Sequence, residues 1–221
     1  MLALMSTADA AEPALRADAA RNRERIVAAA RELFAERGIN APLEDVAQRA
    51  GVGIATLYRR FPTRADLIAG AFEAKLADYA DAVTTALADP DPWRGFCGYL
   101  ETVCAMQAID RGFAELLTLT FPAAKVLEAK RVEAYDGFAE LITRAKAGGR
   151  LREDFVSEDL VLLLMANAGV IAATGDAAPD AWRRTLAYFI QSFAAENTAP
   201  LPEPPTKASL FRAMVRLNRG T

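Results

Sequence analysis

The chain has 221 residues, of which 52% are hydrophobic and 25% are charged, and its net charge is -3 at neutral pH. This composition supplies a globular core and excludes an intrinsically disordered chain. The sequence contains no histidine, which removes the commonest general base and most mixed-ligand zinc sites. We therefore expect no metal, no cofactor and no catalytic activity, since carboxylates such as Glu101, Asp110 and Glu115 form no constellation that singles them out.

The charges are unevenly distributed along the chain. Residues 16–68 carry ten arginines and seven acidic residues, so this segment is cationic although the whole chain is anionic. A cationic end on an acidic body is the pattern expected when one end of a protein meets phosphate. The N-terminal stretch has neither the basic region nor the long apolar run of a signal peptide, which predicts a soluble cytoplasmic protein.

Residues 1–17 are rich in alanine, contain Pro13 and have no sustained apolar period, which predicts a disordered arm. Arg16, Arg21 and Arg23 lie in or beside this arm. Two interpretations stay open for these arginines: they reach an adjacent minor groove of DNA, or they form a solvated basic face.

The first helix is predicted over residues 18–37. Ile26, Ala30, Leu33 and Phe34 fall on one face at helical spacing, and Gly38 follows where a helix often ends on a left-handed residue. We expect this apolar face to pack on the two short helices that follow, because two short helices alone bury too little surface.

Those two short helical patterns meet at a Gly-Val-Gly turn, residues 51–53. The first helix, residues 43–50, has one apolar face and ends at Gly51. Such a helix-turn-helix places its second helix in the major groove of DNA. In this second helix the predicted packing side holds Ile54, Leu57, Tyr58 and Phe61, and the predicted outer side holds Ala55, Thr56, Arg59 and Arg60.

This stretch resembles the DNA-binding motif of TetR-type transcriptional repressors over roughly residues 20–70. The resemblance rests on the Ala-Gly-Val turn at residues 50–52, the Thr-Leu-Tyr run at residues 56–58, Phe61 and Arg64. The sequence departs from the common pattern at Pro42 and Gly53, where serine or threonine often caps a helix. Glycine caps almost as well as serine, and proline suits a first helical turn, so the fold is expected to tolerate both changes.

Contacts with bases are expected from the start of the second helix. Backbone and small side chains at Gly53, Ile54 and Ala55 approach base edges most closely, and the Ala55 methyl group suits a thymine methyl. Arg59 is the candidate for a contact with guanine.

Contacts with the DNA backbone follow from the resemblance. It implies phosphate contacts for Thr56, Tyr58 and Arg64, whose hydroxyl, phenol and guanidinium groups are suitable donors. Arg60 either touches the DNA backbone or is solvated, and the sequence does not decide between these two roles.

The remainder of the chain is predicted to be helical. Thr63 caps a helix over residues 64–87, which the resemblance implies moves the headpiece when ligand binds. Five further helical patterns cover residues 93–108, 111–120, 123–147, 159–173 and 179–197. We expect an all-α fold divided into a disordered arm (1–17), a three-helix DNA-binding headpiece (18–62), a helical effector-binding and dimerisation body (63–198) and a C-terminal segment (199–221).

Aromatic and aliphatic side chains are concentrated in the central helices of the body. They form either an ordinary core or, as the resemblance implies, the lining of an apolar effector pocket. Asn167 is the one amide in a long apolar run, and a satisfied core amide is favoured over a ligand contact. The candidate effector-binding residues are Phe96, Tyr99, Leu100, Val103, Phe113, Leu117, Phe121, Phe138 and Asn167.

The patterns at residues 159–173 and 179–197 combine small residues with an extended apolar face. We expect two copies of the chain to join these helices in a four-helix interface, with burial inside one chain as the alternative. The candidate interface residues are Ala166, Gly169, Ala173, Leu186, Phe189, Ile190 and Phe193.

Two features remain open. Cys97 and Cys104 lie seven residues apart in a helical pattern, too far for a mutual disulfide, so they are either buried thiols or oxidant sensors. After the Pro-rich residues 199–206, a short amphipathic helix containing Leu210, Phe211 and Met214 either docks on the body or lies on a membrane surface; docking is favoured.

Together these features predict a homodimeric, ligand-responsive DNA-binding repressor. It binds a palindromic double-stranded DNA operator, and a small apolar effector releases it. The alternative is a helical carrier or sensor of an apolar small molecule that binds no specific DNA.

Overall fold

The computed structural model describes residues 7–119 and 125–219. In these ranges the chain is all-α: ten α-helices and one short 3-10 turn, with no β-structure beyond a single bridge between Leu151 and Ala194. The predicted fold class is confirmed. The helices are α1 (Thr7–Arg37), α2 (Leu43–Ala50), α3 (Ile54–Arg60), α4 (Arg64–Leu87), α5 (Pro92–Ile109), α6 (Arg111–Thr118), α7 (Lys125–Ala147), α8 (Ser157–Thr174), α9 (Ala181–Phe193) and α10 (Lys207–Arg219).

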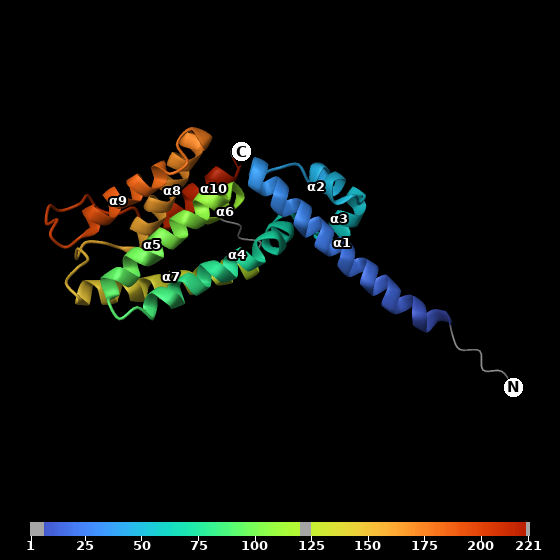
Figure 1. Ribbon diagram of the computed structural model, residues 1–221, viewed down its shortest axis with the longest axis horizontal. Helices are drawn as coiled ribbons and strands as arrows, with labels where there is room; N and C mark the ends of the chain where they lie inside the picture. Colours follow the sequence, from blue (N-terminus) through green and yellow to red (C-terminus); the bar gives the residue numbers. More distant parts are fainter. Residues whose placement is uncertain (1–6, 120–124, 220–221) are drawn as a thin grey trace.

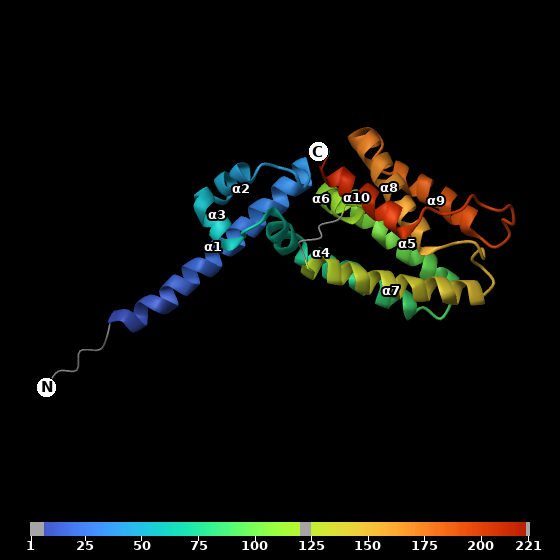
Figure 2. The same ribbon diagram turned by 180° about the vertical axis from the view of Figure 1, so that it is seen from behind.

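Two parts of the molecule are visible in Figures 1 and 2. Helices α1, α2 and α3 form a headpiece at one end, and α5 to α10 form a body at the other. Helix α4 joins them: its first turns lie beside α1, and the rest packs along α5 and α7.

Helix α1 is longer than the sequence predicts. We expected residues 1–17 to be disordered, but α1 begins at Thr7, so residues 7–17 are helical and only residues 1–6 lie outside the described part. Alanine has the highest helix propensity of the amino acids, which explains a helix without an apolar face. This first part of α1 projects away from the body (Figure 1).

The headpiece core has the predicted partners. Phe34 of α1, Val46 of α2 and Leu57 of α3 are fully buried, and Phe61 is nearly so. Gly51 has φ +62° and its N–H donates to the Gln48 carbonyl oxygen, so α2 ends where the sequence indicated. Three helices therefore share one core that holds α3 in place.

Two residues of α3 were assigned to the wrong side. Ile54 and Tyr58 were predicted to pack inward, yet Ile54 is 37% exposed and Tyr58 is 46% exposed. Helix α3 has only seven residues, and Leu57 supplies its buried contact. The outward face of α3 is therefore broader and more apolar than we predicted.

Helix α4 has the predicted bounds and cap. The Thr63 hydroxyl accepts a hydrogen bond from the Asp66 N–H, and the Asp66 carboxylate accepts one from the Thr63 N–H. This capping box satisfies two backbone N–H groups at the point where the headpiece meets the body. Leu67, Ile68 and Phe72 then face the core.

The body is built around a chain of aromatic contacts. Phe96 stacks on Phe138 at 5.8 Å between ring centroids, and Tyr99 stacks on Phe138 at 5.2 Å. Phe155 meets Phe193 edge to face at 4.8 Å. These rings link α5, α7, α9 and the segment before α8 into one core.

The C-terminal segment wraps back onto the body. The buried Arg152 donates hydrogen bonds to the carbonyl oxygens of Ser192 and Ala199, and the Asp154 carboxylate accepts one from the Leu201 N–H. Helix α10 then packs against α8. In α10, Leu210 and Met214 are buried and Phe211 is 48% exposed, so the structure places this helix on the body rather than leaving its apolar face free.

Helix α8 stands out by its exposure. The segment Ser157–Ala177 is long and apolar enough to cross a membrane by length and composition alone, yet less than a quarter of its apolar window is buried. An apolar helix that its own chain leaves uncovered normally has a partner.

Candidate nucleic-acid interface

The outward face of α3 is open and small at its start. Gly53 caps α3, and a Cβ atom placed on it would meet nothing within 4 Å. Ile54 and Ala55 follow on the exposed surface. Because Leu57 anchors the other face, the predicted base-contacting residues Gly53, Ile54 and Ala55 lie on an accessible surface.

Polar and cationic side chains continue this surface. Arg59 and Arg60 are exposed, as predicted, and Arg59 donates a hydrogen bond of 2.8 Å to the Thr56 hydroxyl. Within the described residues Arg60 has neither a hydrogen-bond nor an ion-pair partner. Tyr58, exposed beside them, presents its phenol outward. The structure therefore brings together all the predicted DNA-contacting residues of α3.

Arg64 lies differently from the other candidates. Its Nη1 donates to the carbonyl oxygens of Ile39, at 3.0 Å, and Ala41, at 2.7 Å. Burial lowers the pKa of Arg64, but an arginine remains charged at neutral pH. The predicted phosphate donor is thus also a clamp on the loop between α1 and α2, a role that the sequence did not suggest.

The same loop is held from the body. The Glu115 carboxylate of α6 accepts a hydrogen bond of 2.9 Å from the Ile39 N–H and pairs with Arg111. Gly38 has φ +83°, and a Cβ atom there would lie 2.5 Å from the Glu115 carboxylate oxygens. Only glycine fits both the backbone and this close approach, so α6 and the headpiece are in direct contact.

Several headpiece arginines are engaged inside the headpiece. Arg25 donates to the carbonyl oxygen of Gly51, and Arg31 donates to that of Ala71 in α4. Arg37 pairs with Asp45 at 2.7 Å, and Arg49 makes two hydrogen bonds to the Glu36 carboxylate. Each partner lies outside the helix that carries its arginine, so no helical spacing in the sequence indicated it.

The arginines near the start of the described headpiece also have partners. Arg21 pairs with Asp18, and Arg23 lies over the Phe61 ring at 5.5 Å. The side chain of Arg16 lies outside the described part. The cationic surface that faces away from the core is therefore centred on Arg59 and Arg60 of α3.

Comparison with known proteins agrees with this geometry. Residues 26–71 match a model described as bacterial regulatory proteins of the tetR family, and residues 91–191 match the C-terminal domain of SbtR-like transcriptional regulators. The first range contains the helix-turn-helix, and the second contains most of the body. The chain belongs to the TetR family. It is a transcriptional regulator with a DNA-binding helix-turn-helix.

Individual relatives support this assignment over part of the chain. An HTH-type transcriptional regulator of Staphylococcus aureus strain USA300 is 43% identical over 54 residues, which is 24% of this chain and 29% of that relative. The match therefore spans less than a third of the length of this curated relative.

Solved structures share the fold. A TetR-family regulator from Agrobacterium tumefaciens has a TM-score of 0.59 at 17% identity and covers 80% of this chain and 100% of its own. The TetR-family regulator PfmR from Thermus thermophilus has a TM-score of 0.53 at 21% identity, covering 76% and 96%. At these identities the likeness concerns the fold alone.

The predicted effector-binding residues of this TetR-family chain lie in the core of the body. Phe121 is outside the described residues. The others are at most 6% exposed, so they pack against one another and leave both interpretations open. The buried residues are Phe96, Tyr99, Leu100, Val103, Phe113, Leu117, Phe138 and Asn167.

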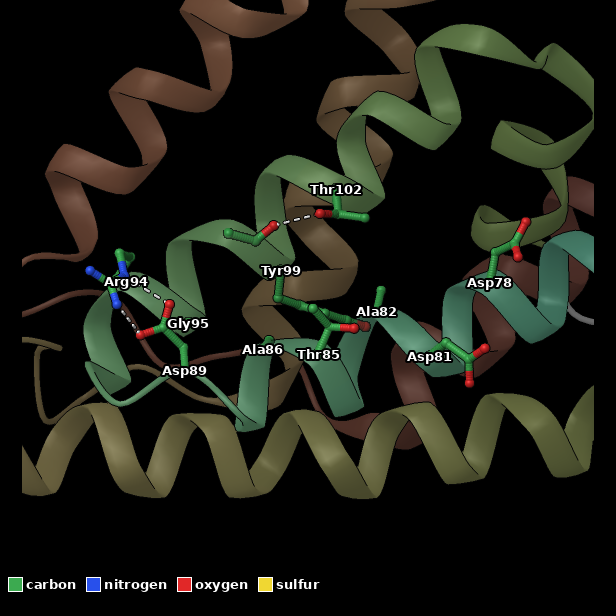
Figure 3. A pocket seen from close by; sticks show the side chains of 11 residues that line it. Asp78, Asp81, Ala82, Thr85, Ala86, Asp89, Arg94, Gly95, Tyr99 and Thr102 are labelled. Carbon is green, nitrogen blue, oxygen red and sulfur yellow. Dashed lines mark hydrogen bonds and ion pairs between the residues drawn. The ribbon is translucent and has the colours of Figure 1, made fainter.

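One of these residues borders an open groove. A groove of about 380 Å³ lies between α4 and α5 (Figure 3). Tyr99 extends from α5 toward Thr85 on its floor, and Arg94 pairs with Asp89 at one end. Asp78 and Asp81 of α4 line the rim. The rim of this groove therefore carries two carboxylates, and Tyr99 is the predicted effector-binding residue that borders it.

Asn167 is only half satisfied, contrary to the favoured interpretation. Its Nδ2 donates to the Gln107 Oε1 at 2.8 Å, but its Oδ1 has no hydrogen-bond partner among the described residues although Asn167 is fully buried. Gln107 in turn donates to the Leu164 carbonyl oxygen at 3.2 Å. Gln107 was not among our candidates, although it is also an amide within an apolar run, residues 103–109, the same signal that singled out Asn167.

The predicted interface residues divide into two groups. Leu186 and Phe193 are buried in the core of their own chain, so their assignment to a dimer interface was wrong. Both face the body because α9 packs inward on α5 and α8. The residues that remain at least partly accessible are Ala166, Gly169, Ala173, Phe189 and Ile190.

The two cysteines occupy apolar surroundings. Cys104 is fully buried and Cys97 is partly buried. Burial raises the pKa of each thiol to about 12. A thiol that stays protonated is a poor nucleophile, which favours a structural role over oxidant sensing.

Proposed function

We propose that the chain is a ligand-responsive repressor that binds a palindromic DNA operator as a homodimer and is released by a small, largely apolar effector. The observation that carries this proposal is the outward face of α3. Gly53, Ile54 and Ala55 leave room for bases at its start, and Arg59 and Arg60 add positive charge further along. A rigid helix with this distribution suits the major groove.

Individual contacts are proposed from these positions. Arg59, whose guanidinium is held over Thr56, reads guanine, and the small side chain of Ala55 meets a thymine methyl. Thr56, Tyr58 and Arg60 contact phosphates. Arg64 also contacts phosphate, through the guanidinium N–H groups that do not bond the loop between α1 and α2. The DNA-binding unit extends over residues 18–62.

The dimer is proposed to form through α8 and α9. Support comes from the incomplete burial of the apolar α8 and from Tyr188 of α9, which is 58% exposed. A second copy that places the same two helices on this face would cover both in a two-fold arrangement. Half-sites of the operator would then lie one helical turn or a multiple apart.

The experiment is a mobility shift with a labelled duplex taken from upstream of the protein's own coding region. We expect salt-sensitive retention that an unlabelled copy of the duplex abolishes and a scrambled duplex does not. The double variant Arg59→Ala/Arg60→Ala should lose this retention, whereas Arg212→Ala/Arg216→Ala, on the exposed surface of α10, should keep it.

The second candidate function is a helical carrier or sensor of an apolar small molecule without specific DNA binding. The buried aromatic chain through Phe96 and Phe138 is the observation that favours it. Equal retention of specific and scrambled duplexes would support this carrier. A cytoplasmic location is proposed with either function.

A further inference from the structure

We propose that the carbonyl oxygen of the Asn167 side chain is a ligand-binding group, and that the ligand is a neutral, mostly apolar molecule that carries a hydrogen-bond donor such as a hydroxyl or amide N–H. This inference rests on the proposed function, because it names the chemistry of the effector that the body would take.

The first step is the unpaired acceptor. Asn167 is fully buried in α8, and its Oδ1 is without a hydrogen-bond partner among the described residues. Buried polar atoms are paired in the great majority of cases, because an unpaired one loses its hydrogen bonds with water and gains nothing in return. Such an atom marks a place where a donor would be bound favourably.

The second step is that the orientation of the amide is fixed. The Leu164 carbonyl oxygen can only accept, so Gln107 must present its Nε2 there and turn its Oε1 toward Asn167. Asn167 must therefore present Nδ2 to Gln107, at 2.8 Å. Rotating the Asn167 amide would set two oxygens against each other, so Oδ1 remains the free atom.

The third step concerns charge. The Asn167 side chain donates hydrogen bonds to the Cys104 carbonyl oxygen and to the Gln107 side-chain amide, and both acceptors are neutral. A charged ligand here would be buried without a counter-ion, which is strongly unfavourable.

The fourth step concerns the surroundings. Helix α8 packs against α5 and α6. Both helices bury mainly apolar side chains, among them Val103, Leu116 and Leu117, which favours an apolar body for a ligand held between these helices. Because α6 also carries Glu115, which holds the Ile39 N–H of the headpiece, a ligand that enters between α8 and α6 acts on a helix in direct contact with the headpiece.

The experiment compares two probes that differ in one donor. Phenol has a hydroxyl donor, and anisole is the same ring with that donor methylated. Binding of each to the full chain, without DNA, is followed by titration of backbone and side-chain amide NMR signals. We expect phenol to bind about tenfold more tightly than anisole and to shift the Asn167 side-chain amide signals, as one buried hydrogen bond implies.

Variants assign the preference to the site. Asn167→Leu should bring the two affinities within about threefold, whereas Asn197→Leu, which removes an exposed amide after α9, should keep the preference. Should Asn167→Leu fail to fold, the wild-type protein provides the second measurement: an intermolecular NOE should connect the ring protons of bound phenol with the side-chain amide protons of Asn167, and its absence at saturation would overturn the proposal.

Several outcomes would overturn the proposal. These are equal binding of the two probes, no detectable binding of either, a phenol preference retained in Asn167→Leu, or a soaked crystal with an ordered water alone on the Asn167 Oδ1. DNA is absent from these experiments, so their results do not depend on whether the protein is a repressor. Phenol binding without any specific operator would refute the repressor and leave this site intact.

Discussion

Replacing Arg64 by alanine should loosen the headpiece more than it weakens contact with phosphate. In the structure its guanidinium bonds the carbonyl oxygens of Ile39 and Ala41. Each hydrogen bond from a charged donor contributes about 1.5–3 kcal/mol, and the partial exposure of Arg64 lets water replace part of this contribution. We therefore expect Arg64→Ala to lower the local stability of α2 by about 2–3 kcal/mol for the two bonds together.

Hydrogen exchange of the α2 amides measures this loss directly. A loss of about 2–3 kcal/mol should speed exchange of residues 43–50 by about 30- to 140-fold at a fixed pH. The matched control is Arg60→Ala, which removes the same charge from a side chain without a described partner and should leave α2 exchange within about threefold of the wild type.

The salt dependence of DNA binding decides between the two roles of Arg64. A phosphate contact alone would lower the slope of log affinity against log salt by about 0.9 and leave exchange of α2 unchanged. That result for Arg64→Ala would refute the clamp. Faster exchange with an unchanged slope would confirm the clamp and remove the phosphate contact.

Three further predictions follow from burial and charge. Leu57→Ala, which removes most of a fully buried side chain, should lower the free energy of unfolding by about 2–5 kcal/mol and abolish DNA binding. The control Ile54→Ala should lower the melting temperature by far less. Equal melting temperatures of the two variants would disprove the packing of α3. Because burial raises the pKa of both thiols to about 12, Cys97 and Cys104 should react slowly with iodoacetamide at pH 8 in the native protein and rapidly in urea, and fast native labelling would argue for an oxidant sensor. The Arg152 guanidinium lowers the pKa of Asp154 from 3.8 to about 2. The stability that this ion pair gives to the folded C-terminal segment is therefore fully present above about pH 4 and is lost as pH falls through 2. Residues 199–206 should become protease-sensitive over that pH range in the wild type, and in Asp154→Asn they should be sensitive already at pH 7.

Much of the fold could be predicted because local patterns and tertiary packing agree. Gly38 and Gly51 ended the predicted helices where positive φ angles do so in the structure. Thr63 capped α4 as expected. At these positions one residue type satisfies a backbone requirement, so the sequence alone identifies the boundary.

The wrong predictions concern the direction in which a side chain faces, either in a short helix or in a helix that could pack on its own chain or on a second copy. Tyr58 and Ile54 sit on a seven-residue helix whose rotation is set by Leu57, and the period alone does not fix that rotation. Leu186 and Phe193 were assigned to an interface because apolar spacing does not tell an intramolecular neighbour from a second copy. The clamp by Arg64 and the unpaired oxygen of Asn167 depend on distant partners, which no local pattern encodes.

The backbone of Ile39 connects two helices that are otherwise separate in the sequence. Its N–H is held by Glu115 of α6, and its carbonyl oxygen is held by Arg64 of α4. The N–H and the carbonyl group belong to the two rigid peptide planes that meet at the Ile39 Cα atom, so a shift of α6 relative to α4 that keeps both bonds must change the φ and ψ angles of Ile39. Such a rotation would also move Ala41 and the first residues of α2. The position of α2 therefore depends on the position of α6 relative to α4.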